Sequence, residues 1–204
     1  MRIEGGELRG RLITAPHGNT TRPTDGRTRE MLFNSLGGFI VGARVLDLYA
    51  GSGSVGLEAL SRGAASCVFV EQEHSAIQTI KKNLKIFGLE SQAQVWAGNA
   101  RSAVAKLDEN GDHFDFIFAD PPFTLVNEGE EIAKRLDSHC RLLNNVSVGN
   151  EAVSDEEEDY QPQRLIVIQH SRRVTLPTFQ NLILKREKRA GESVLSFLIP
   201  QSQQ

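Results

Sequence analysis

The chain has 204 residues, of which 39% are hydrophobic and 24% charged, and its formal net charge at pH 7 is −3. This length and apolar content suffice for one substantial core, and the two cysteines, Cys67 and Cys140, are too few for a disulfide framework. No apolar run approaches the roughly 20 residues of a membrane span and no charged-then-apolar leader opens the chain, so we expect a cytoplasmic protein without a membrane partner.

Residues 1–38 predict a small extension that precedes the main domain. Gly5-Gly6 and Gly10 indicate a short, twisted β-hairpin or an extended arm over residues 1–16. A helix that carries the apolar residues of 31–36 should follow and end at Gly37. The arginines of this extension suit either a solvated surface or an arm that contacts RNA, and the residue pattern leaves both interpretations open.

The stretch from Val45 to Gly56 predicts a small-molecule site. It reads as a buried strand, a glycine turn and the start of a helix, whose partly positive N-terminus faces the same space. Gly51 and Gly53 remove side chains where the backbone bends, so a ligand can approach the main-chain N–H groups closely.

This glycine pattern is compatible with two ligand classes. Gly51-x-Gly53-x-x-Gly56, with Glu71 downstream, also satisfies the fingerprint of nicotinamide dinucleotide domains. Asp47 argues against that class, because a carboxylate just before the turn would repel a pyrophosphate and attract a cationic ligand.

Strands and helices alternate through the rest of the chain. Strands are expected at 93–97, 114–119 and 165–168, and helices at 74–87 and about 129–142. The segments 182–186 and 194–199 leave no room for a crossover helix between them, so they must form an antiparallel hairpin. The plan predicts an α/β, Rossmann-like fold in which a C-terminal hairpin closes a parallel five-strand core, as in class I methyltransferases that use S-adenosylmethionine.

Asp120-Pro121-Pro122-Phe123 follows the strand expected at 114–119 and should lie in the same crevice at the carboxyl edge of the sheet. The Asp120 side chain and the Pro121 carbonyl form paired acceptors, and Phe123 supplies a flat face. These groups suit a planar base with an exocyclic amino group. A Pro-Pro turn after a strand is common by itself, but together with the glycine loop it favours a base-modifying site.

Charge is distributed unevenly along the chain. Residues 144–163 contain six acids and no base, which leaves the remaining residues with a net charge of +3. Residues 164–189 contain seven bases and one acid, so the average hides a basic face that suits a nucleic acid. The acidic stretch predicts a flexible insertion, because it has too few apolar residues to offset its ordering entropy.

With these motifs the chain resembles the bacterial 16S ribosomal RNA guanine-N2 methyltransferase family over nearly its whole length, apart from the acidic stretch. Many methyltransferases share the glycine box, whereas the arginine-rich N-terminal string is found in a much narrower set of proteins. The matching segments are Arg9-Gly10-Arg11, Arg22-Pro23-Thr24, Arg29 to Asn34, Val45 to Gly53, Gly56 to Ala64, Asp120 to Phe123 and Arg186 to Gly191.

The resemblance implies S-adenosyl-L-methionine as the cofactor and the exocyclic N2 amino group of a guanine in 16S ribosomal RNA as the methyl acceptor. It also implies an RNA-contacting extension over residues 1–38 and a methyltransferase domain over residues 39–200. The implied catalytic residues are Asp120, Pro121, Pro122 and Phe123. The implied cofactor-binding residues are Asp47, Tyr49, Gly51, Ser52, Gly53, Glu71, Gln72, Asn99, Ala100 and Asp120. The implied RNA-binding residues are Arg9, Arg11, Arg22, Arg27, Arg29, Lys185, Arg186 and Lys188.

The implied partner is ribosomal RNA in an assembling small subunit, bound by a monomer. No metal is expected, because the histidines show no metal-ligand spacing. Asn99 departs from the family, which usually has Asp there, and should weaken cofactor binding without abolishing it. Gln169-His170 ends the fifth strand where relatives often carry an acid, and His170 is interpreted as a structural residue rather than a base.

Three other classes are weighed against this assignment. A DNA or protein amino-methyltransferase would share the Asp120 box, and binding to duplex DNA would favour it. A nicotinamide-dependent oxidoreductase would have to bind pyridine nucleotide. A catalytically inactive RNA-binding protein would have lost the acceptor box, which is intact here. The sequence leaves open which guanine is modified, and whether naked RNA or an assembling subunit is the substrate.

Overall fold

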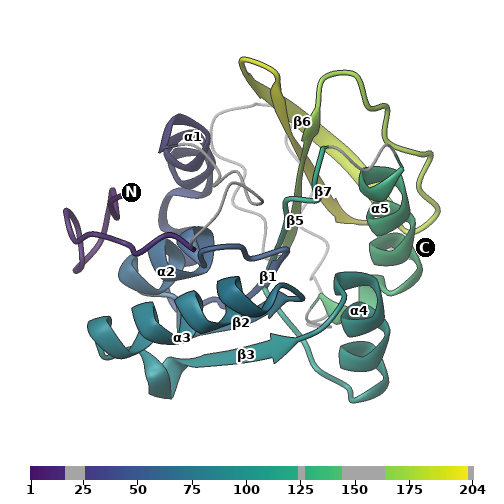
Figure 1. Cartoon of the computed structure of the whole chain (residues 1–204). Coiled ribbons are helices and arrows are strands. Elements are labelled where there is room, and N and C mark those ends of the chain that lie inside the picture. Colours follow the sequence, from purple (N-terminus) through teal and green to yellow (C-terminus); the bar gives the residue numbers. More distant parts are fainter. Residues whose placement is uncertain (17–25, 124–126, 144–163, 202–204) are drawn as a thin grey trace.

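The computed structural model describes residues 1–16, 26–123, 127–143 and 164–201. Its strands are β1 (Arg44–Leu48), β2 (Ser66–Glu71), β3 (Ala93–Ala97), β4 (Phe116–Ala119), β5 (Leu165–Ser171), β6 (Leu182–Ala190) and β7 (Ser193–Pro200). They form one sheet in the order β3-β2-β1-β4-β5-β7-β6 (Figure 1). The first five strands of this order pair in parallel, and β7 pairs antiparallel with both β5 and β6. The predicted parallel five-strand core with a C-terminal antiparallel hairpin is confirmed.

Helices cover both faces of the sheet, and each face has its own apolar core. The helices are α1 (Gly26–Leu36), α2 (Ser54–Ser61), α3 (His74–Phe87), α4 (Ala100–Glu109) and α5 (Glu128–Ser138). The buried apolar residues of α1, α2 and α3 form one cluster with one face of the sheet, and those of α4 and α5 form a second cluster with the other face. The central strand β1 is therefore buried on both sides, as its run of apolar residues predicts.

The helix predicted over residues 74–87 is confirmed as α3. The Glu73 side chain caps it by accepting a hydrogen bond from the Ala76 N–H (2.7 Å), and Gly88 ends it in a left-handed conformation. The helix expected at about 129–142 is shorter: α5 ends at Ser138, and a 3₁₀ turn follows over Cys140–Leu142.

The N-terminal arm folds back on itself as a short antiparallel hairpin, one of the two forms expected. Arg2 and Leu12 form an antiparallel bridge, and on either side of it the Ile3 N–H donates to the Arg11 carbonyl (3.0 Å) and the Ile13 N–H to the Met1 carbonyl (2.9 Å). The arm packs against the C-terminal end of α2, where the Glu7 N–H donates to the Ser61 carbonyl (2.8 Å). A Cβ at Gly6 would lie 1.8 Å from that carbonyl oxygen, so only glycine fits this approach. Ile3 and Ile13 of the arm lie in the same core cluster as α1 and α2.

A buried ion network ties the arm, α1 and α2 together. Arg29 and Glu58 both have side chains that are 0% exposed, and Nε of Arg29 donates to Oε2 of Glu58 (2.9 Å). Arg62 donates to the other carboxylate oxygen, Oε1 (2.8 Å), and its guanidinium lies over the Phe33 ring (4.8 Å). Arg29 also donates to the Arg2 carbonyl (2.8 Å), so this network fixes the N-terminal arm to the main domain.

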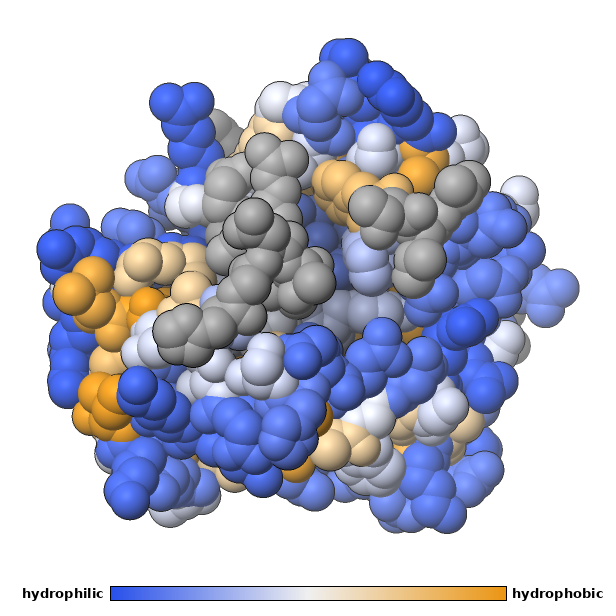
Figure 2. Space-filling view, viewed as in Figure 1, coloured by the Kyte–Doolittle hydropathy of each residue, from blue (hydrophilic) through white to orange (hydrophobic). Residues whose placement is uncertain are grey.

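Among the residues that the structure describes, no helix is long and apolar enough to span a membrane. The face seen in Figure 2 is mostly hydrophilic, with apolar side chains gathered at its left edge and in a smaller group in its upper part.

Candidate active site

The candidate active site lies where three neighbouring strands end. Strand β1 lies between β2 and β4 and pairs in parallel with both. The carboxyl ends of the three strands therefore lie at the same edge of the sheet. Open α/β sheets bind ligands in the crevice at such a switch point. Asp47, Glu71 and Asp120 come from these three strand ends, and the charges of Glu71 and Asp120 are close enough to act on Asp47.

The glycine loop between β1 and α2 has left-handed backbone at three positions. Gly51 has φ +55°, Gly53 has φ +77°, and Tyr49 is the single non-glycine residue with positive φ in the described chain, at +60°. A Cβ at Gly53 would lie 3.3 Å from the Phe69 ring, so the loop also packs tightly against β2. A strained tyrosine in a ligand loop persists only where its surroundings hold it.

Asp47 lies in β1, just before this loop, and is buried, with 2% of its surface exposed. Its carboxylate accepts a hydrogen bond from the Gly56 N–H in the first turn of α2 (2.9 Å). Burial raises the pKa of Asp47 to about 7, the Gly56 N–H opposes that rise, and the neighbouring charges of Asp120 and Glu71 add to it. In dinucleotide domains the N–H groups at this helix N-terminus receive a phosphate. Because Asp47 takes one of those donors and adds negative charge, the geometry disfavours a pyrophosphate.

Glu71 is held by the backbone on the other side of the loop. Its carboxylate accepts hydrogen bonds from the N–H groups of Gly51, Gln72 and Glu73 (2.8–2.9 Å). Within the described part of the chain, neither Asp47 nor Glu71 has a Lys, Arg or His within ion-pair distance. The pocket is therefore electronegative and suits a ligand with positive charge and hydroxyl donors.

Two further atoms at the same edge bear on which ligand fits. The Ser52 hydroxyl is buried and has no hydrogen-bond partner among the described residues, although it lies in the glycine loop. Such an orphaned group is costly unless something satisfies it. The Asn99 side-chain oxygen, unlike the Ser52 hydroxyl, has partners within the protein. It caps α4 by accepting hydrogen bonds from the N–H groups of Arg101 (2.9 Å) and Ser102 (3.4 Å). Ala100 follows as the first, buried residue of α4.

The Asp120 box follows β4 directly. The Asp120 N–H donates to the Leu48 carbonyl (3.4 Å), which joins the start of the box to the end of β1. Pro121 is buried, Pro122 is exposed, and Phe123 leaves 46% of its surface to solvent. An exposed phenylalanine beside paired acceptors is available to stack on a planar base.

A hydrogen-bond bridge that the sequence did not reveal connects the glycine loop to α5. The Tyr49 hydroxyl donates to Oε1 of Glu128 (2.6 Å), and Arg101 on α4 pairs with the same carboxylate (3.5 Å). Burial and the adjacent Glu128 carboxylate raise the pKa of Tyr49. Helix α5 begins shortly after the Asp120 box. The bridge therefore fixes the position of the glycine loop relative to α5, and so relative to the Asp120 box.

His170 is engaged inside the sheet rather than in the crevice. Its Nδ1 lies 3.0 Å from the Ser171 carbonyl oxygen and its Nε2 lies 2.8 Å from the Ser196 hydroxyl, which donates to Glu187 (2.9 Å). Both ring nitrogens therefore have hydrogen-bond partners, one from β5 and one from β7, and Glu187 of β6 joins them through the Ser196 hydroxyl. This agrees with the structural role expected for His170.

The predicted RNA-binding residues differ in their exposure. Arg9, Arg11, Arg27, Lys185 and Arg186 are exposed, Lys188 is half-buried, and Arg22 lies outside the described residues. The prediction for Arg29 is contradicted by the structure, because its guanidinium is fully buried against Glu58 and has no surface for a phosphate. The sequence signal was misleading because a buried and an exposed arginine look alike in an arginine-rich string.

Known proteins resemble this chain over most of its length. The family model described as Conserved hypothetical protein 95 matches residues 1–199. The Bacillus subtilis protein named "Putative rRNA methyltransferase YlbH" is 36% identical over 192 residues, 94% of each chain. The Escherichia coli "Ribosomal RNA small subunit methyltransferase D" is 43% identical over 127 residues, 60% of each chain. The solved structure of "Putative methyltransferase yhhF from Escherichia coli" has a TM-score of 0.73 and 34% identity, and covers 100% of this chain and 99% of that one.

Proposed function

This chain belongs to the Conserved hypothetical protein 95 family, and from that premise we propose that it methylates the N2 amino group of a guanine in bacterial 16S ribosomal RNA, using S-adenosyl-L-methionine. The observation that carries the proposal is the meeting of two features at one sheet edge. An electronegative pocket with the glycine loop lies at the carboxyl ends of β1 and β2. The Asp120 box, with its paired acceptors and exposed aromatic ring, lies at the carboxyl end of β4.

The pocket fits the cofactor by charge and by hydrogen bonding. S-adenosylmethionine carries an ammonium and a sulfonium, and Asp47 offers a carboxylate that has no cationic partner among the described residues. Glu71 retains acceptor capacity for ribose hydroxyls, since each carboxylate oxygen has two lone pairs. When bound, the cofactor supplies an already activated methyl group, so the protein needs no nucleophilic side chain.

The acceptor box then positions the methyl acceptor. The Asp120 carboxylate and the Pro121 carbonyl accept the two hydrogens of the guanine amino group, and Phe123 stacks on the base. This alignment is the main contribution to catalysis, because it fixes the attacking nitrogen. As the bond from N2 to the methyl group forms, the methyl–sulfur bond would break and S-adenosylhomocysteine would leave. The nitrogen gains positive charge, which the same two acceptors stabilise, and the Asp120 carboxylate would take the proton that the nitrogen loses.

Ribosomal RNA in an assembling small subunit is the proposed partner, in the bacterial cytoplasm, with a monomeric enzyme that uses no metal. Residues 1–38 would contact the RNA and residues 39–200 would carry the catalytic domain. The acidic stretch 144–163 lies outside the described residues. We propose that its charge competes with phosphates for the basic face of residues 164–189.

Replacing Glu71 by alanine should weaken S-adenosylmethionine binding by about 1–3 kcal/mol, because charge-assisted hydrogen bonds are lost and the N–H groups of Gly51, Gln72 and Glu73 lose their acceptor. Isothermal titration calorimetry measures this effect. Glu109→Ala, which alters an exposed acid on α4, serves as the control. Unchanged affinity in Glu71→Ala would place the ribose elsewhere.

Cofactor binding should also depend on pH through Asp47. Its pKa of about 7 means that the free protein holds a proton on this carboxyl at pH 6, and a cationic ligand must expel that proton. The dissociation constant for S-adenosylmethionine should therefore be about tenfold larger at pH 6 than at pH 8. S-adenosylhomocysteine, which lacks the sulfonium charge but keeps the ammonium and the carboxylate, should show a smaller pH dependence, and an Asp47→Asn variant should show a flatter profile. Parallel profiles for both ligands would contradict this role of Asp47.

The activity itself is tested by transfer of a tritiated methyl group from S-adenosylmethionine to naked 16S ribosomal RNA, to small subunits and to duplex DNA, followed by nucleoside analysis. We expect N2-methylguanosine from an RNA substrate. Label in DNA or in protein would favour the alternative amino-methyltransferases, and binding of NAD would favour an oxidoreductase.

A further inference from the structure

The first turn of α5 carries three acids that differ in burial. Glu130 and Glu131 leave 42% and 47% of their side chains exposed, whereas Glu128 leaves 10%. A favourable interaction with the helix N-terminus does not require burial. A buried carboxylate needs specific partners, and Glu128 has two, the Tyr49 hydroxyl (2.6 Å) and the Arg101 guanidinium (3.5 Å).

The bond to Glu128 restrains the part of the glycine loop that meets Glu71. Tyr49 has φ +60°, a conformation that a non-glycine residue leaves unless its surroundings hold it. Two residues later, the Gly51 N–H donates to the Glu71 carboxylate (2.8 Å). A shift of Tyr49 toward a relaxed backbone would therefore displace the Gly51 N–H from Glu71, in the pocket proposed for S-adenosylmethionine.

The same turn of α5 lies beside the Asp120 box. A Cβ at Gly129, the residue after Glu128, would lie 3.9 Å from Cγ of Pro121 and 3.7 Å from Cγ1 of Val174, which are van der Waals distances. One helical turn thus meets the glycine loop through the Glu128 side chain and lies against the acceptor box at Gly129. A change in that turn can alter the distance between the methyl donor and the target amine.

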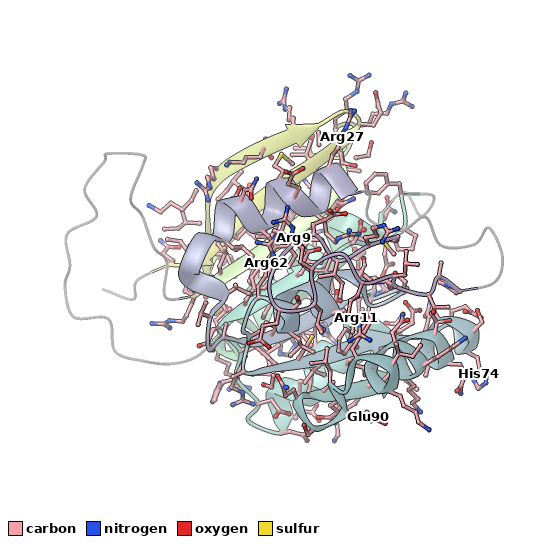
Figure 3. All side chains as sticks on the ribbon, turned by 90° about the vertical axis from the view of Figure 1, so that its left-hand side faces the viewer. Arg9, Arg11, Arg27, Arg62, His74 and Glu90 are labelled. Carbon is pink, nitrogen blue, oxygen red and sulfur yellow. The ribbon has the colours of Figure 1, made fainter. Side chains whose placement is uncertain are left out.

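Glu128 is separate from the predicted RNA-binding arginines of the N-terminal arm. Figure 3 shows Arg9 and Arg11 on the side of the molecule that faces the viewer, between α1 and α3. The apolar residues of α5 belong to the core on the opposite face of the sheet from those of α1 and α3. A change at Glu128 therefore leaves the arm in place, and its effect on the rate can be separated from an effect on the KM for RNA.

We propose that Glu128 is a positioning residue for methyl transfer, which acts through Tyr49. This inference rests on the proposed function, because the rate that it concerns is that of methyl transfer to RNA. The carboxylate holds the Tyr49 hydroxyl, Tyr49 holds the backbone that leads to Gly51, and Arg101 compensates the buried charge. The methyl donor is thereby kept in line with the amine that the Asp120 box holds, and such alignment is sensitive to small displacements.

The main test compares substitutions in α5 that differ in whether they remove the bond to Tyr49. Glu128→Ala removes it, Glu128→Gln keeps an oxygen that can accept it, and Glu131→Ala removes the other acid that pairs with Arg101 (3.6 Å). Single-turnover rates are measured with S-adenosylmethionine and RNA both saturating. We expect Glu128→Ala to be slower by about tenfold, well short of the roughly 100-fold that a misplacement of about 1 Å can cost. Glu128→Gln and Glu131→Ala should stay within about threefold of wild type, and the KM for RNA should change by at most about twofold in all three.

A second substitution removes the same bond from its other end. Tyr49→Phe deletes one oxygen and keeps the ring that packs against the core beneath α4 and α5, so it tests the bridge even if Glu128→Ala fails to fold. We expect a similar loss of rate, and Tyr49→Phe/Glu128→Ala should be no slower than the slower single variant, because both changes break one interaction. If the two losses multiply, the residues act independently and the bridge is overturned. A wild-type rate in Tyr49→Phe would also overturn it, by assigning any loss in Glu128→Ala to the charge beside Arg101.

Amide hydrogen exchange of residues 49–53 in the free protein tests the bridge without RNA. We expect faster exchange in Glu128→Ala and Tyr49→Phe, and wild-type exchange in Glu131→Ala. If wild-type protein methylates ribosomal RNA but Glu128→Ala turns over like Glu131→Ala, the inference fails and the proposed function stands. If wild-type protein does not methylate ribosomal RNA, the proposed function is wrong. Faster exchange in the two bridge variants would then still show that Glu128 holds the glycine loop, and equal exchange would remove that role too.

Discussion

Replacing Asp120 by alanine is expected to reduce the single-turnover rate of methyl transfer to ribosomal RNA about 10²–10³-fold, the loss typical of removing one preorganised acceptor or donor from a developing charge. The carboxylate lies at the end of β4 and its main chain is joined to the end of β1 through the Leu48 carbonyl. The substitution removes the side-chain acceptor and leaves that main-chain bond in place. The rate is measured with enzyme in excess over RNA.

Cofactor affinity separates this effect from a damaged pocket. The dissociation constant for S-adenosylmethionine should change by at most about twofold in Asp120→Ala, because the interaction acts on the target amine in the transition state. Phe123→Ala should also slow transfer, through lost stacking, and Glu109→Ala on α4 should turn over like wild type. A normal single-turnover rate in Asp120→Ala would show that the acceptor box does not carry the chemistry.

Replacing Glu58 by alanine is expected to lower the free energy of unfolding by about 3–5 kcal/mol, the typical result of removing one partner from a buried ion pair. The carboxylate and the Arg29 guanidinium are both 0% exposed, so the variant leaves a buried charge without its partner. Chemical denaturation measures the loss. The matched control is Glu130→Ala, which breaks the exposed pair with Lys134 and should cost about 0.3–0.5 kcal/mol.

A second substitution distinguishes the unpaired charge from a simple loss of packing. In Glu58→Leu/Arg29→Met both charges are replaced by apolar groups, which should recover much of the stability lost in Glu58→Ala. If the double variant is as unstable as the single one, the cost comes from lost packing at the junction of the arm, α1 and α2. A Glu58→Ala variant that unfolds like Glu130→Ala would contradict the network's role altogether.

The parts of the fold that follow from local pattern were predictable. The strand, glycine turn and helix around Gly51 and Gly53, the amphipathic helix over 74–87 and the C-terminal hairpin each depend on residues close in sequence. Strand and helix ends were less predictable: β4 starts at Phe116 rather than at residue 114, and α5 gives way to a 3₁₀ turn. Those ends depend on contacts such as the pairing of Arg141 and His139 with Asp108, which lies on another helix.

The features that the sequence could not give all join residues that are distant along the chain. Glu58 reads as an ordinary polar residue of α2 until Arg29 and Arg62 are seen to converge on it. Glu128 reads as a favourable acid in the first turn of α5, and its bond to the hydroxyl of Tyr49 appears only in three dimensions. The same limit explains Arg29, since a motif shows which residues are present but not which of them are buried.

The central claim is that this protein methylates N2 of a guanine in 16S ribosomal RNA through the Asp120 box. The most direct test is nucleoside mass spectrometry of 16S ribosomal RNA from cells that lack the gene and from the same cells carrying either wild-type protein or Asp120→Ala. The account predicts that one N2-methylguanosine disappears in the deletion, returns with wild-type protein and does not return with Asp120→Ala. An unchanged set of N2-methylguanosines in the deletion would contradict it.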